Sequence, residues 1–391
     1  MKSSTTFRWH RSIKEIPREK WAHLVNKKVL PFYDWNWLNA LEESESVSSR
    51  YGWQPLHLSL WENNRLISLA PLYLKNHSYG EFIFDQAFAN LSNRLSVPYY
   101  PKLIGMSPLS PIEGYKFFIS SEKDSREITE VMMKIIDEFA INNNISSCNF
   151  LYVDPSWKKH GESANCSSWI NKQTLWSSHG EQSFEDYLAR FNSNQRRNIK
   201  KERQSITKTD LRISIINGEE INLAMMEMMH NFYEAHCSRW GAWGSKYLTK
   251  AFFERLANKD LANNIVLFNA NRGNPKEPIA MSFCITDYQT LWGRYWGSKE
   301  EIKNLHFELC YYSPISWAIK NGIKEFDPGA GGNQKMRRGF TATPRFSLHR
   351  WYDNTMAQII KDWLPKANNM MKEEINASNN EVPFIHTKID L

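Results

Sequence analysis

The sequence lacks the cysteine patterns that mark metal-binding or disulfide-stabilised proteins. Its 391 residues include five cysteines, at positions 148, 166, 237, 284 and 310, and these form no Cys-x-x-Cys pair. Neither a zinc ribbon nor a disulfide scaffold is therefore supported. We expect a reducing compartment, in which free thiols persist.

Long hydrophobic runs are missing as well. No stretch approaches the roughly 20 apolar residues that cross a bilayer. Residues 1–16 also lack the apolar core of a signal peptide. We therefore expect a cytoplasmic protein without a transmembrane segment. Wholesale disorder is excluded too, because 41% hydrophobic and 23% charged residues are values typical of globular proteins.

Basic charge and aromatic side chains are abundant. The formal net charge is +7, which favours an anionic partner. The 16 tryptophans, 16 tyrosines and 21 phenylalanines suit both packed cores and the walls of a deep cleft. At roughly 100–200 residues per domain, the length predicts two domains.

The first half has the periodicity of a mixed α/β domain, which we place at residues 1–170. Apolar residues at helical spacing and alternating runs between turn signals identify its elements. We expect helices at 34–43 and 125–142 and strands at 56–61, 66–74, 81–84 and 148–153. The polar stretch 155–178 contains the predicted domain boundary.

The second half, 171–391, opens with a strongly basic helix at 183–205, begun by Ser183 and Asp186 in a capping-box arrangement. We expect further helices at 219–238, 245–257 and 305–320, and strands at 211–216, 264–269, 278–287, 290–297, 324–327 and 346–352. The last of these helices ends at Asn321-Gly322, a typical C-terminal stop. This order predicts an α+β domain built on an antiparallel sheet.

Short motifs in both halves carry a family resemblance. They are LYLK (72–75), GEFIFD (80–85), YYPKL (99–103), SPIEG (110–114), GRYWG (293–297), HFELCYY (306–312), DPGAG (327–331), MRRGF (336–340) and SLH (347–349). Together, over roughly 30–365, they resemble the FemAB-like family of predicted N-acyltransferases, relatives of the enzymes that add amino acids to peptidoglycan precursors. The resemblance implies α+β architecture with two tandem GNAT-like (acyl-CoA N-acyltransferase type) domains, each a mainly antiparallel mixed sheet flanked by helices. It also implies transfer of an acyl or aminoacyl group to the amine of a small molecule or peptide.

The resemblance leaves two donors open, acyl-CoA and aminoacyl-tRNA. An acyl-CoA site needs backbone N–H groups that cradle a diphosphate at a helix N-terminus, usually in a glycine-containing loop. The corresponding segment here, SKEEIKN at 298–304, has no glycine and carries two acids. This disfavours acyl-CoA and keeps tRNA as an expected partner. We expect no tightly bound cofactor and no metal.

The chemistry is expected between Trp292 and His349. No cysteine has a base beside it, so we predict direct attack of the amine without a covalent enzyme intermediate. Candidate general bases are Glu308, His306 and Asp327. On a helix, His306 would share a face with Cys310 while Glu308 points away. For His306, helix capping or packing is an alternative role.

Substrate-binding candidates follow from charge, glycine content and position. The loop after Asp327 combines turn glycines with cations suited to a carboxylate or phosphate, although a solvated basic loop is the alternative. Arg294 is a long cation within an apolar strand, and acids on a predicted strand of the first half could line an acceptor cleft or form a structural ion-pair network. The candidates are Arg294, Trp296, Gly329, Gly331, Lys335, Arg337, Arg338, His349, Glu81, Asp85 and Lys102.

The basic helix offers a second type of site. Arg196, Lys200 and Arg203 would share one face, which suits the phosphates of a tRNA backbone. The alternative is a solvated face. A non-catalytic RNA- or anion-binding protein on a degenerate transferase fold is accordingly the rival function.

Overall fold

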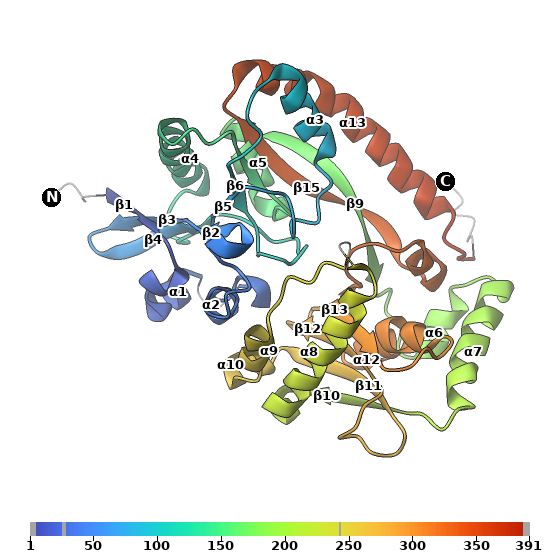
Figure 1. Ribbon diagram of the computed structural model, residues 1–391. Coiled ribbons are helices and arrows are strands. Elements are labelled where there is room, and N and C mark those ends of the chain that lie inside the picture. The colour runs from blue at the N-terminus through green and yellow to red at the C-terminus, as the bar shows by residue number, and fades with distance from the viewer. Residues whose placement is uncertain (1–4, 26–28, 242–243, 386–391) are drawn as a thin grey trace. The chain divides into compact units, whose positions relative to one another are not determined.

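The computed structural model describes residues 5–25, 29–241 and 244–385. The chain divides into two compact units, the first of residues 1–172 and 344–373 and the second of residues 173–343 and 374–391 (Figure 1). A single cut at residue 170 assigns 344–373 to the second domain. In the structure this segment belongs to the first unit, because Leu348–Trp351 pair with Ser147–Phe150.

The first unit contains two sheets. Strands run in the order β1-β3-β4-β7 in one and β15-β8-β6-β5-β2 in the other, where β6 and β8 are parallel. Its strands are β1 (Thr5–His10), β2 (Trp53–Pro55), β3 (His57–Glu62), β4 (Arg65–Ala70), β5 (Tyr73–Lys75), β6 (Lys102–Gly105), β7 (Phe118–Ile119) and β8 (Ser147–Phe150). Its α-helices are α1 (Arg18–Val25), α2 (Trp35–Glu43), α3 (Gln86–Leu95), α4 (Ser125–Asn142) and α5 (Pro155–Ser163). Short 3₁₀ turns are η1 (Ile13–Glu15), η2 (Pro31–Tyr33) and η3 (Ser49–Tyr51).

Local chemistry explains the elements that the sequence predicted well. Asn63 and Asn64 both adopt positive φ, as the two-residue turn of the β3–β4 hairpin requires. Asp124 caps α4 by accepting a hydrogen bond from the Glu127 N–H. The buried face of α4 repeats every three to four residues, from Ile128 to Ala140, which confirms the predicted helix at 125–142.

The second unit is built on a sheet with the order β10-β11-β12-β13-β14-β9, antiparallel except for the β13–β14 pair. Three elements pass from one unit to the other along the chain: β9 (Ser167–Ser177), β15 (Thr341–Trp351) and α13 (Asn354–Asn380). The unit's own strands are β10 (Arg212–Asn217), β11 (Ile265–Asn271), β12 (Ala280–Thr286), β13 (Thr290–Ser298) and β14 (Glu325–Asp327). Its helices are α6 (Phe184–Ala189), α7 (Ser193–Thr207), η4 (Gly218–Glu220), α8 (Leu223–Ser238), α9 (Lys250–Leu256), α10 (Lys259–Ala262), α11 (Leu305–Phe307), η6 (Glu308–Tyr312), α12 (Ser313–Lys320) and η7 (Asn333–Arg338).

The segment from β13 to β14 is a parallel strand-helix-strand crossover. The predicted helix at 305–320 is present as α11, η6 and α12, and η6 is a π-helical turn. On the sheet, α8 packs across β13 (Figure 1). This contact requires Gly297, because a Cβ there would lie 2.3 Å from the Phe232 carbonyl oxygen.

Some predicted elements differ from the structure. The strand expected at 66–74 is divided into β4 and β5, which belong to different sheets. Residues 81–84 do not form a strand, since Phe82 has a φ of 56° and Asp85 begins α3. The basic helix expected at 183–205 is broken into α6 and α7, because Phe191 turns into the core and Asn192 starts a new helix by capping the Gln195 N–H. The capping box of Ser183 and Asp186 is confirmed at α6.

The polar stretch 155–178, in which the domain boundary was predicted, contains all of α5 and β9. In α5, Asp154 caps the N-terminus and Pro155 occupies the first turn, a start signal that the later glycine and serines obscured. No described helix has the length and apolar character needed to cross a membrane.

Candidate functional site

A β-bulge marks the centre of the second unit's sheet. On the β12 side, Phe283 pairs with Tyr295 and Cys284 pairs with Gly293, so Arg294 is an extra residue in β13. On the other side, β14 pairs with β13 only as far as Trp292. Because β14 ends at Asp327, the ladder ends there too, and the edge of β13 after Trp292 is separated from strand pairing on this side.

The loop after β14 lies close to this separation. Gly329 has a φ of 84°, and a Cβ on it would lie 3.0 Å from the Gly293 carbonyl oxygen. Asp327 fixes the turn by accepting the Gly329 N–H at 2.8 Å. Arg294 in turn binds Asp327 at 3.1 Å and the Gly293 carbonyl at 2.9 Å. Arg294 and Asp327 are thus paired with each other, and neither group is a free acid or base.

Lys335 completes this cluster. Its side chain is buried, and its ammonium donates to the carbonyl oxygens of Gly329 at 2.5 Å and Ala330 at 3.1 Å. Burial lowers the pKa of Lys335 to about 8, against the opposing attraction of Asp327. The amine is therefore mainly charged at neutral pH. Of its three N–H donors, one has no partner among the described residues.

His306 belongs to the same cluster through its neighbours. Its ring contacts those of Trp296 and Tyr311, with centroids 5.3 and 5.4 Å away. Burial lowers its pKa to about 4, assisted by nearby cations that include Lys335. His306 is therefore neutral at pH 7, and no described group hydrogen-bonds to its ring nitrogens. The structure thus joins Arg294, Asp327, Gly329 and Lys335 by direct contacts, and it places His306, packed on Trp296, within electrostatic reach of Lys335.

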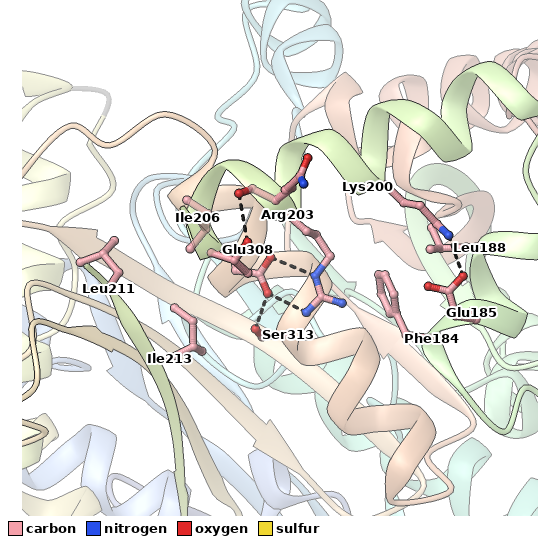
Figure 2. A pocket seen from close by; sticks show the side chains of 12 residues that line it. Phe184, Glu185, Leu188, Lys200, Arg203, Ile206, Leu211, Ile213, Glu308 and Ser313 are labelled. Atoms are coloured by element: carbon pink, nitrogen blue, oxygen red, sulfur yellow. Dashed lines mark hydrogen bonds and ion pairs between the residues drawn. The ribbon is translucent and has the colours of Figure 1, made fainter. Parts of the chain in front are cut away.

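Glu308 is engaged elsewhere. Its carboxylate is buried and forms a two-point ion pair with Arg203, at 3.1 Å to Nε and 2.9 Å to Nη2 (Figure 2). Ser313 donates a further hydrogen bond at 2.8 Å. The sequence correctly placed Glu308 on a different face from His306, but this ion pair argues against a role as general base.

Arg338 differs most from the expected exposed loop cation. Only 1% of the residue is exposed. Its guanidinium donates to Glu202 at 2.8 Å and to the Gln334 carbonyl at 2.8 Å, and it stacks on Phe307. Arg338 therefore holds the loop from inside and is not placed to clamp a ligand. Arg337 and Gly331 of the same loop are exposed and do not join the cluster.

Glu81, Asp85 and Lys102 form a separate cluster in the first unit. Lys102 donates to Glu81 at 2.9 Å and to Asp85 at 2.7 Å, and all three side chains are buried. Ser78 and Tyr99 each donate to Asp85 at 2.6 Å. Burial raises the pKa of Glu81, while Lys102 contributes to lowering that of Asp85. The cluster forms a buried ion-pair network on a loop.

His349, also in the first unit, has both ring nitrogens engaged. They hydrogen-bond to Asn149 at 2.7 Å and to Ser347 at 2.8 Å. Burial lowers its pKa to about 3, and its ring contacts Phe88 and Trp351. A buried, neutral and fully bonded imidazole is not available to a substrate in this conformation.

The expected basic stripe on α7 is also partly used within the protein. Arg196 donates to the Phe191 carbonyl at 2.9 Å, Lys200 pairs with Glu185, and Arg203 pairs with Glu308. The sequence reasoning missed Glu202, which binds both Arg338 and Tyr312. The sequence did hold a signal for this role, because Glu202 is an acidic residue within an otherwise basic helix. Among the described residues, no three His, Cys, Asp or Glu side chains gather as they would around a metal ion.

Comparison with known proteins identifies the family. A family model for FemAB-like proteins, described as peptidoglycan biosynthesis/recognition, matches residues 12–386. No curated protein sequence matches the chain. A similar solved structure is the C-terminal DUF2156 domain of a protein assigned as a lysylphosphatidylglycerol synthetase from Agrobacterium fabrum, with 8% identity, a TM-score of 0.51, and coverage of 90% of this chain and 96% of that one.

Two further structures are more distant. A tandem GNAT protein from the clavulanic acid biosynthesis pathway has 7% identity and a TM-score of 0.45, covering 89% of this chain and 98% of its own. FemX has 11% identity and a TM-score of 0.47, covering 82% and 93%. The predicted α+β fold of tandem GNAT-like domains is confirmed. The chain belongs to the FemAB-like family and is in general terms an acyl- or aminoacyltransferase.

Proposed function

We propose that the second unit transfers an acyl or aminoacyl group from an activated ester or thioester to an amine at the separated edge of β13. The observation that carries this proposal is the unpartnered N–H of the buried Lys335 ammonium beside the bulge at Arg294. A fixed donor in a site of low dielectric is what a developing oxyanion requires. Its carbonyl partners, from Gly329 and Ala330, hold it in place.

The reaction is a direct displacement. The amine nitrogen attacks the carbonyl carbon, a C–N bond forms, and the C–O or C–S bond to the donor breaks. The proton released by the amine passes to the leaving oxygen or sulfur. Neutral His306 can accept a hydrogen bond from the attacking amine, but with a pKa of about 4 it orients the nucleophile and does not store its proton. Asp327 and Arg294 act by positioning the loop.

The segment 298–304 bears on the donor. The Glu300 N–H is held by Ser298 and the Leu305 N–H by the Ile302 carbonyl, so these two groups are not available to a phosphate. Arg272 pairs with Glu300 through both of its terminal nitrogens, so this nearby cation is not available to a phosphate either. These contacts favour an aminoacyl ester, as in aminoacyl-tRNA, over acyl-CoA.

The test is a transfer assay with two donors. Purified protein is incubated with amine acceptors and either a mixed pool of aminoacyl-tRNAs or acetyl-CoA, and products are identified by mass spectrometry. We expect amide formation from aminoacyl-tRNA, reduced about 100-fold in Lys335→Met. Lys303→Met, which removes an exposed lysine of the neighbouring loop, should retain activity. Binding of tRNA without turnover of either donor would support the rival function of a non-catalytic RNA-binding protein.

A further inference from the structure

A cavity of about 430 Å³ lies between α6, α7, β10 and the π-helical turn of the second unit (Figure 2). Small-molecule sites commonly have volumes of about 300–1,000 Å³. Its lining combines apolar residues of α6, α7 and β10 with the ion pairs Lys200–Glu185 and Arg203–Glu308. None of the lining residues belongs to the cluster around Lys335.

One part of the wall is apolar. Ile206 and Leu211 are buried, and Ile213 of β10 lies on the same side of Arg203, while the buried Leu188 lies on the opposite side near Lys200 (Figure 2). The Phe184 ring covers the other side of the Arg203 guanidinium, whose central carbon lies 4.2 Å from the ring centroid. Burial of a hydrocarbon chain against such a wall is favourable because it removes apolar surface from water.

Arg203 supplies a rigid polar group. Glu308 takes two of its five N–H donors and Ser316 a third at 3.4 Å, while the remaining two have no partner among the described residues. Its side chain is 31% exposed. The ion pair with Glu308 thus fixes the guanidinium and leaves donors for an anionic acceptor.

Lys200 provides a second cation near the opening. It lies one helical turn before Arg203 and pairs at 2.8 Å with Glu185, with side-chain exposures of 52% and 71%. Exposed pairs of this kind contribute little to stability, so Lys200 can exchange Glu185 for a ligand at little cost.

We propose that this cavity binds a monocarboxylate that carries an apolar chain, with the carboxylate at Arg203 and Lys200 and the chain against Ile206, Leu211 and Ile213. An amine head group is disfavoured beside Arg203, because Glu308 has both oxygens engaged there and the other carboxylate of the lining, Glu185, is exposed at the opening and pairs with Lys200. A polyphosphate is disfavoured because two carboxylates balance the two cations of the lining. A single negative charge with a hydrocarbon tail satisfies both constraints.

Calorimetric titration with octanoate tests the proposal, with octylamine and inorganic phosphate as comparison probes. We expect saturable binding of octanoate and much weaker binding of the other two. Ile213→Trp should fill the cavity and weaken octanoate binding roughly tenfold or more, and Lys200→Gln should weaken it by a similar factor. Neither change touches the Arg203–Glu308 pair, so both proteins should fold.

Matched controls come from the same elements. Ile215→Trp places an equal side chain at an exposed position of β10 outside the lining, and Lys201→Gln removes the adjacent exposed lysine of α7. Both should bind octanoate as the unmodified protein does. Absence of octanoate binding, equal binding of octylamine, or equal effects of the control and cavity variants would each overturn the proposal.

Discussion

The guanidinium carbon of Arg338 lies 3.5 Å from the centre of the Phe307 ring, so a cation of the loop after β14 is stacked on the first turn of the 305–320 helix. The same guanidinium pairs with Glu202 of α7. One side chain therefore fastens three segments that meet near Lys335. Cation–π contacts strengthen when they are desolvated, as this one is.

Replacing Arg338 should destabilise the fold. We expect Arg338→Ala to lower the free energy of unfolding by about 3 kcal/mol, near the lower end for a broken buried ion pair, because Glu202 keeps some access to water. Denaturant unfolding monitored by tryptophan fluorescence measures this change. The exposed neighbour Arg337→Ala is the control and should stay within about 0.5 kcal/mol. Equal stabilities of the two variants would contradict the packing described for Arg338.

The pKa of Lys335 predicts how transfer depends on pH. If the charged ammonium stabilises the oxyanion, its contribution to kcat/KM should fall as pH rises through about 8, approaching tenfold per pH unit. The attacking amine becomes more reactive as pH rises, which has the opposite effect on the rate. The informative quantity is therefore the ratio of the kcat/KM values of a variant and the unmodified protein at each pH. Lys335→Arg keeps its charge to much higher pH. The activity of this variant relative to the unmodified protein should therefore rise above pH 8, and a constant ratio would exclude the role proposed for Lys335.

Lys75 predicts a pH dependence of stability in the first unit. It is buried over the Trp53 ring, donates to the Tyr79 carbonyl, and has a pKa lowered by burial to about 7. The unfolded chain, with a lysine pKa near 10.5, holds more protons between these values. This group therefore makes stability rise with pH, by up to about 1.4 kcal/mol per unit.

Lys75→Met isolates that contribution, because methionine preserves the apolar stem without the charge. Between pH 7 and pH 9, the unmodified protein should gain stability relative to the variant in denaturant unfolding. A difference that is independent of pH would mean that Lys75 keeps an ordinary pKa in the folded protein.

Local signals in the sequence were sufficient for much of the fold. Helical spacing identified α4, and alternating runs identified the strand at 56–61 and the start of the next at 66, because both patterns depend on residues near each other in sequence. The prediction of a strand at 81–84 was wrong, because Glu81 and Asp85 are held by Lys102, which is distant in sequence. The chain's return into the first unit through β15 depends on pairing with β8, which is equally non-local.

In the candidate site, too, the sequence indicates some features, while others depend on contacts between distant residues. Cations near the DPGAG turn were visible in the sequence, but their burial was not. Lys335 and Arg338 are three residues apart, yet the first faces the Gly329 carbonyl and the second faces Glu202, more than a hundred residues earlier. Only packing distinguishes a cation placed for chemistry from one that fastens a loop.

The last prediction concerns RNA binding by α7. The structure changes which residues of α7 are available to RNA, because Arg196 and Arg203 are bound within the protein. Arg197 and Lys201 are exposed and lie one turn apart. If tRNA contacts this helix, Arg197→Glu with Lys201→Glu should remove two phosphate contacts. The plot of log affinity against log salt should then become shallower by about 1.4–1.8, because each contact contributes roughly 0.7–0.9. Lys361→Glu with Lys366→Glu on α13 makes the same change in net charge at exposed positions and should leave the slope unaltered. Equal changes in both double variants would attribute binding to overall charge, and no change in either would leave α7 as a solvated face.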